Sequence, residues 1–123
     1  MKQHIGPSQL AELSDERKES LRQWWEPRMN SGDWFHGKHG GGRGFIAHYE
    51  GALPLMSIAQ CIELLNNKTN EMAMGYNNSG CFWRVVIGPN GTGAMIEGFG
   101  KEFADYDSGE LIDALWQAVK EVL

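Results

Sequence analysis

The chain has 123 residues and a formal net charge of −5, and 41% of its residues are hydrophobic, including five Trp and five Phe. This length and composition fit one domain with a modest core, so residues 1–123 are expected to fold as a single domain. No apolar run approaches the roughly 20 residues that span a bilayer, and the first residues lack the order of a signal peptide. The sequence therefore predicts a cytoplasmic protein without membrane contact.

The acidic excess lies at the C-terminal end, where residues 97–123 contain seven acidic residues and two lysines. A surface of this sign repels phosphate backbones, which disfavours direct binding to DNA or RNA. It favours instead a partner protein with a basic groove. Cys61 and Cys81 lie far apart without a Cys-x-x-Cys pair, so both are expected to be small buried hydrophobic residues.

The first long helix is predicted from Asp15 to Trp25. Apolar residues recur there at helical spacing, and Ser14 before Asp15 and Glu16 is typical of an N-cap followed by acids in the first turn. Pro27 disfavours helical geometry at the residue before it, so the helix should end at this point.

Residues 30–44 are rich in Gly, His and Asn and have no hydrophobic period, which predicts a flexible Gly/His-rich loop. A strand is expected from Arg43 to Glu50. A second helix then follows a cap at Ser57, with an apolar stripe at Ile58, Cys61, Ile62 and Leu65. Asn66 and Asn67 can end this helix.

Three segments are predicted to form an antiparallel meander: Met72–Tyr76, Cys81–Ile87 and Ala94–Phe99. Turn-forming residues separate them at 77–80 and 88–93. The segment Cys81–Ile87 is rich in β-branched and aromatic residues, so it is expected to be the central strand.

The last helix is predicted to begin near Asp107 and Glu110, which resemble a capping box, and to run to Leu123. Its wide apolar stripe should pack on the sheet. The expected fold class is therefore α+β, with a small antiparallel β-meander packed against about three helices.

Three blocks carry a resemblance to a known group of proteins. They are Leu21–Pro27 (LRQWWEP), Leu53–Gln60 (LPLMSIAQ) and Glu110–Lys120 (ELIDALWQAVK). In order and spacing the blocks resemble those of small uncharacterised proteins encoded by phages and prophages of Gram-positive bacteria. The resemblance covers roughly a third of the chain and implies a phage origin, with specificity residing in the segments between the blocks.

The candidate binding residues are aromatic and arginine side chains, which are enriched at interface hot spots, and acids that can meet a basic partner. They are Trp34, Arg43, Trp83, Arg84, Glu102, Asp105 and Asp113. Core packing is the competing interpretation of the aromatic residues.

Two alternatives depend on other chemistry. His36, His39 and His48 are residues that zinc accepts, which leaves open a small metal-dependent enzyme, although their spacing lacks a paired zinc motif. Arg43 and Arg84 with nearby aromatics can instead bind and sequester a small nucleotide signal. The sequence lacks the G-x-S-x-G motif that is typical of a nucleophilic serine.

The leading hypothesis is a phage-encoded accessory protein that works by binding a host protein in the infected cell. Its origin, size and acidic C-terminal quarter favour an antagonist of bacterial antiviral defence, similar to an anti-CRISPR inhibitor. The partner would be a nucleic-acid-binding defence effector, and the oligomeric state is left open.

Overall fold

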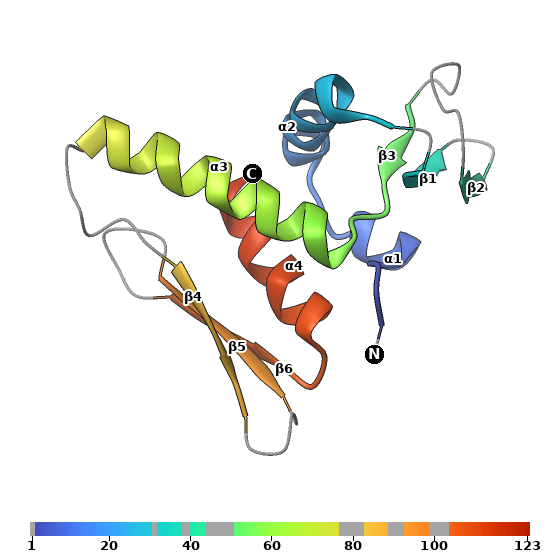
Figure 1. Cartoon of the computed structure of the whole chain (residues 1–123). Helices are drawn as coiled ribbons and strands as arrows, with labels where there is room; N and C mark the ends of the chain where they lie inside the picture. The colour runs from blue at the N-terminus through green and yellow to red at the C-terminus, as the bar shows by residue number, and fades with distance from the viewer. Residues whose placement is uncertain are drawn as a thin grey trace. The chain divides into compact units, whose positions relative to one another are not determined.

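A computed structural model describes residues 2–30, 32–37, 40–43, 51–76, 83–88, 93–98 and 104–123, with backbone only for 40–43, 71–76 and 104–106. These residues contain four α-helices and two three-stranded antiparallel sheets (Figure 1). The α+β prediction is confirmed. The chain groups into two compact units, one made of residues 1–3 and 58–122 and the other of His4–Ser57 with Leu123. The single-domain expectation stays a prediction, because two compact units can form one domain or two.

The N-terminal unit, His4–Ser57, begins with a short helix α1 (Pro7–Leu10) and the predicted helix α2 (Asp15–Trp25). The Ser14 Oγ accepts the backbone N–H of Arg17 at 3.2 Å, which confirms the predicted N-cap. A 3-10 turn, η1 (Glu26–Arg28), follows α2 and contains Pro27. The helix therefore ends where the proline was expected to end it.

The predicted loop at 30–44 contains two short strands, β1 (Trp34–Gly37) and β2 (Gly40–Arg43). They pair antiparallel, and β1 also pairs with β3 (Leu53–Pro54), which gives the strand order β2-β1-β3. The prediction of a loop was wrong for these residues. Backbone hydrogen bonds between strands can stabilise glycine-rich residues as strands even when their side chains show no hydrophobic period. Of the strand expected from Arg43 to Glu50, residues 44–50 lie outside the described residues.

A buried carboxylate fixes the chain between α2 and β1. The Oδ2 of Asp33 accepts the indole N–H of Trp25 at 3.0 Å and the backbone N–H of Asn30 at 3.1 Å. Asp33 and Trp25 are both buried, so these bonds satisfy polar groups that would otherwise lose water without compensation. Trp24 is buried as well, so both tryptophans at the end of α2 belong to the core of this unit.

The C-terminal unit begins with α3 (Ile58–Tyr76), which is ten residues longer than a helix ending at Asn66. The predicted strand Met72–Tyr76 is the last part of this helix. Beyond Asn66 and Asn67 the helix continues with Thr69, which is buried and whose Oγ1 donates to the Leu65 carbonyl at 2.7 Å. Asn residues often end helices, but a buried face can override that preference. Cys61, Leu64 and Leu65 form that face before Asn66, and Thr69 continues it beyond Asn67.

The sheet of this unit is a meander of β4 (Trp83–Ile87), β5 (Ala94–Gly98) and β6 (Ala104–Ser108) in sequential order. The prediction of a three-stranded meander is confirmed, but one of its strands differs. The expected first strand is absent from the sheet, and β6 is the third strand instead. The central strand is β5, so the expectation that Cys81–Ile87 is central was wrong. β6 was missed because its Asp-rich sequence has low intrinsic strand propensity.

Helix α4 (Leu111–Val122) packs against β5 and β6, as predicted, and also against α3 (Figure 1). Its buried residues are Ile112, Ala114, Leu115, Trp116, Ala118 and Val119. Each large apolar side chain buried in this way contributes about 1.5–3 kcal/mol. The resulting core covers one face of the sheet.

Candidate functional site

The two faces of the C-terminal sheet follow from its register. Ala94, Ile96 and Gly98 of β5 are buried on the face covered by α4, while Met95 and Glu97 point to the opposite face and are half-buried. Side chains directly opposite one another share a face. We name the face that carries Met95 and Glu97 the open face.

Strand β4 is apolar yet exposed. Val85, Val86 and Ile87 have 36%, 38% and 61% of their surface accessible, and they are three of the four large hydrophobic residues found exposed in the described part of the chain. Among the described residues β4 pairs only with β5, so it is an edge strand. Consecutive exposed apolar residues on an edge are unusual in a monomer and mark an interaction surface.

The backbone hydrogen-bonding groups of β4 point alternately toward β5 and away from it. Gly88 N–H donates to the Gly93 carbonyl at 3.1 Å, in line with the register that pairs Val86 with Met95. Hydrogen-bonded pairs alternate along an antiparallel ladder, so Val86 bonds to β5. The N–H and C=O groups of Val85 and Ile87 therefore point away from β5, toward the outer edge of the sheet.

Two predicted binding residues lie on β4, and both have partners inside the unit. The Trp83 indole N–H donates to Asn66 Oδ1 at 2.9 Å, which joins the strand to α3. The Arg84 guanidinium pairs with Glu97 across the sheet, with Nη2 at 2.6 Å and Nε at 2.7 Å from Oε2. An anionic ligand at Arg84 would have to compete with Glu97, which weakens the case for nucleotide capture there.

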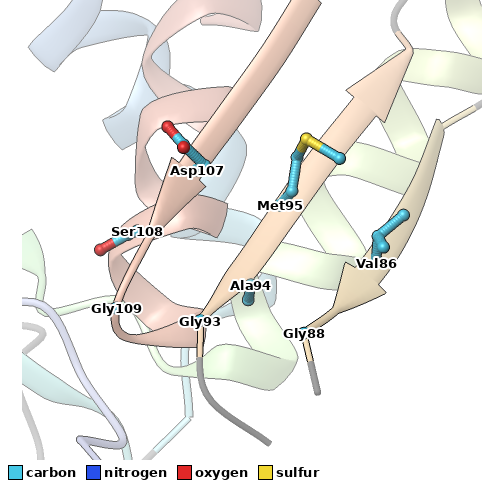
Figure 2. Close-up of a pocket in the computed structure, with 8 residues that line it drawn as sticks. All are labelled: Val86, Gly88, Gly93, Ala94, Met95, Asp107, Ser108 and Gly109. Carbon is cyan, nitrogen blue, oxygen red and sulfur yellow. The ribbon is translucent and has the colours of Figure 1, made fainter.

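A hollow of about 430 Å³ lies at one end of the open face. The hollow is lined by three glycines, Gly88, Gly93 and Gly109. Each glycine is the next residue beyond the row in which Ile87, Ala94 and Ser108 pair, and Figure 2 shows the three at the same end of the sheet. Because these three strands all carry glycine at this level, a whole row of side chains is missing.

The next row of the open face forms the wall of the hollow. Val86 pairs with Met95, and Met95 pairs with Asp107, so the three side chains stand side by side across the sheet. Figure 2 shows the three side chains on one side of the sheet, beside the glycine row. The wall is therefore apolar on β4 and β5 and carries a carboxylate on β6.

Asp107 differs from the acids near it. Asp107 does not form the helix cap expected of it, because α4 begins only at Leu111; in the turn before the helix, the Oγ of Ser108 accepts the N–H of Glu110 at 3.3 Å. Asp113 forms an ion pair with Lys2 at 2.8 Å. Among the described residues, no hydrogen bond or ion pair engages the carboxylate of the exposed Asp107, so it can meet a cation from outside.

The remaining predicted binding residues are divided between the units. Trp34 on β1 is 40% exposed and makes an edge-on contact with His4, with ring centroids 5.9 Å apart. Arg43 ends β2, where its backbone pairs with Trp34, and Asp105 in β6 pairs with Glu97. Glu102 lies outside the described residues. Of the predicted binding residues that the structure describes, Trp83, Arg84 and Asp105 lie in one sheet, and Asp113 lies on α4, which packs against that sheet.

The metal hypothesis stays a prediction. His36 is half-buried on β1 in the N-terminal unit, and His39 and His48 lie outside the described residues. No cluster of three metal-ligating residues forms within the ranges that the structure describes.

Cys61 is fully buried on α3, as predicted, and burial raises the pKa of its thiol to about 12. A protonated, inaccessible thiol is a poor nucleophile, so Cys61 acts as a core residue. Cys81 lies outside the described residues.

Sequence reasoning missed the hollow and the exposure of β4. The signal for the hollow was glycine at the ends of consecutive strands, which becomes visible only when the register is known. A comparison with protein-family models found no match, and searches of curated proteins and of solved structures likewise returned none. No helix in the described segments combines the length and the apolar character needed to cross a bilayer.

Proposed function

We propose that this protein binds another protein through strand β4 and the open face beside it. The observation that carries the proposal is the exposed run Val85–Ile87 on an edge strand whose outer backbone groups face away from the sheet. Edge strands of this kind bind partners by adding a strand, with apolar side chains giving further affinity.

The partner in this proposal is a bacterial host protein, bound in the cytoplasm of an infected cell, and the outcome is antagonism of antiviral defence. The resemblance to phage and prophage proteins supports this part of the proposal. The acidic excess supports a basic partner, such as a nucleic-acid-binding effector. Asp113 contributes little to that attraction, because Lys2 already offsets its charge.

The test places a photo-crosslinking amino acid at Ile87 and, as a control, at Glu16, which is exposed on α2. Both proteins are expressed in bacterial strains that each carry one antiviral system. We expect adducts with a protein of that system from position 87 and none from position 16.

Phage plating on the same strains provides the functional readout. The unsubstituted chain should restore plating of a phage that the system restricts, and a chain with Val86→Thr and Ile87→Thr should not. Threonine keeps the strand propensity of a β-branched residue while removing apolar surface. Equal plating with both chains, or adducts from position 16 alone, would contradict the proposal.

A further inference from the structure

We infer that the hollow beside the glycine row is an anchor site for a lysine or arginine side chain of the partner. This inference rests on the proposed function, because it names the chemistry of the group that the same sheet recognises. Its basis is the combination of a missing row of side chains, an apolar wall and one unengaged carboxylate.

The shape of the hollow suits a long side chain. The row formed by Gly88, Gly93 and Gly109 leaves the backbone without cover, and the volume of about 430 Å³ exceeds that of any single side chain. An extended chain can therefore lie along the row and leave room for the groups that carry it.

The walls suit a side chain with an apolar stem and a cationic end. Val86 and Met95 offer carbon surface to the methylene groups of lysine or arginine, which bury their stems while keeping the charged end solvated. Asp107 stands at the end of the same row and supplies the opposite charge.

The electrostatics of the open face favour a cation as well. Arg84 is the cation on this face of β4, and its ion pair with Glu97 offsets its charge. The Asp107 carboxylate is the acid of the hollow, and none of the described residues offsets its charge. An incoming ammonium or guanidinium group thus meets a net negative local charge, and a phosphate or carboxylate is repelled.

The probes are Nα-acetyl-arginine amide, Nα-acetyl-lysine amide and, as the neutral control, Nα-acetyl-norleucine amide. Each is titrated into the full chain, and backbone amide signals are followed by NMR. We expect saturable shifts at Gly88, Gly93 and Gly109 with both cationic probes, and an affinity about fivefold lower for the neutral probe.

Two variants locate the interaction. Asp107→Asn should lower the affinity for the cationic probes about fivefold, whereas Glu121→Gln removes the same charge about 15 Å along α4 and should leave it unchanged. Gly109→Leu should abolish binding of all probes by filling the hollow. A Cβ at Gly109 meets no atom within 4 Å, so the fold accommodates it, whereas Gly93 has a φ of +77° and would be strained.

The outcomes separate this inference from the proposed function. Equal affinity for charged and neutral probes, shifts away from the glycine row, or no effect of Asp107→Asn would overturn the anchor site. Crosslinking at position 87 would still stand in that case. If the cationic probes bind as expected but no host protein crosslinks at position 87, the anchor site stands and the proposed function fails.

Discussion

Strands β4 and β5 pair over five residues and both carry apolar side chains, but they differ in what covers them. In β5 every second residue is buried under α4, and Ile96 is fully inaccessible. In β4 three consecutive apolar residues are exposed, and Ile87 is 61% accessible. The comparison teaches that the position of a strand in the sheet, rather than its apolar content, decides whether its side chains stabilise the fold or remain available to a partner.

The largest expected effect compares one substitution at two places. Ile96→Ala should lower the free energy of unfolding by about 2–4 kcal/mol, because it leaves a cavity in the core. Ile87→Ala should cost less than about 1 kcal/mol, because the side chain is already mostly in water. Urea unfolding measures both. Similar costs at the two positions would show that β4 is buried in solution.

Proline substitutions sharpen the comparison at the level of the backbone. Val86→Pro removes an N–H that bonds to β5, whereas Val85→Pro removes one that points outward. Val86→Pro should therefore be less stable than Val85→Pro by about 1–3 kcal/mol. Thermal unfolding of the two variants checks the order, and the reverse order would mean that the hydrogen-bond alternation has been assigned to the wrong residues.

Partner binding gives the next effect in size. The double change Val86→Thr and Ile87→Thr should weaken binding to the crosslinked host protein about tenfold, with the unfolding free energy changed by less than about 1 kcal/mol. Trp34→Tyr is the matched control, since Trp34 is the large hydrophobic residue found exposed among the described residues of the other unit. Calorimetry on the purified pair measures the affinities. A tenfold loss with Trp34→Tyr and none with the threonine pair would move the interface to the N-terminal unit.

The smallest effect is expected at the ion pair that joins the two strands. Arg84 is 62% exposed, so its pair with Glu97 should contribute less than about 1 kcal/mol to stability. A double-mutant cycle with Arg84→Met and Glu97→Gln isolates this contribution, which should shrink further at high salt. A coupling energy of several kcal/mol that salt does not change would indicate that this edge of the sheet is shielded from water.

Local signals in the sequence predicted the elements that depend on local structure. The cap at Ser14 and Pro27 gave the limits of α2, and the wide apolar stripe from Leu111 onward gave α4 and its packing on the sheet. The turn residues before Ala94 placed β5. In each case the determining residues are neighbours along the chain.

Features that depend on pairing between distant residues were not predictable in this way. The short strands β1 and β2 are held by their partners, and α3 passes Asn66 because its buried face extends the helix. Whether Val85–Ile87 is central or at the edge depends on which strand pairs beside it. The glycine row likewise exists only through the register of β4, β5 and β6.

Amide hydrogen exchange of β4 tests the central claim most directly. In the isolated protein, the Val86 amide should exchange slowly and the amides of Val85 and Ile87 rapidly, because only the first is bonded within the sheet. In the complex with the crosslinked host protein, Val85 and Ile87 should become protected while Val86 stays as it was. Slow exchange at all three positions in the isolated protein, or unchanged exchange at Val85 and Ile87 in the complex, would contradict a binding role for this edge.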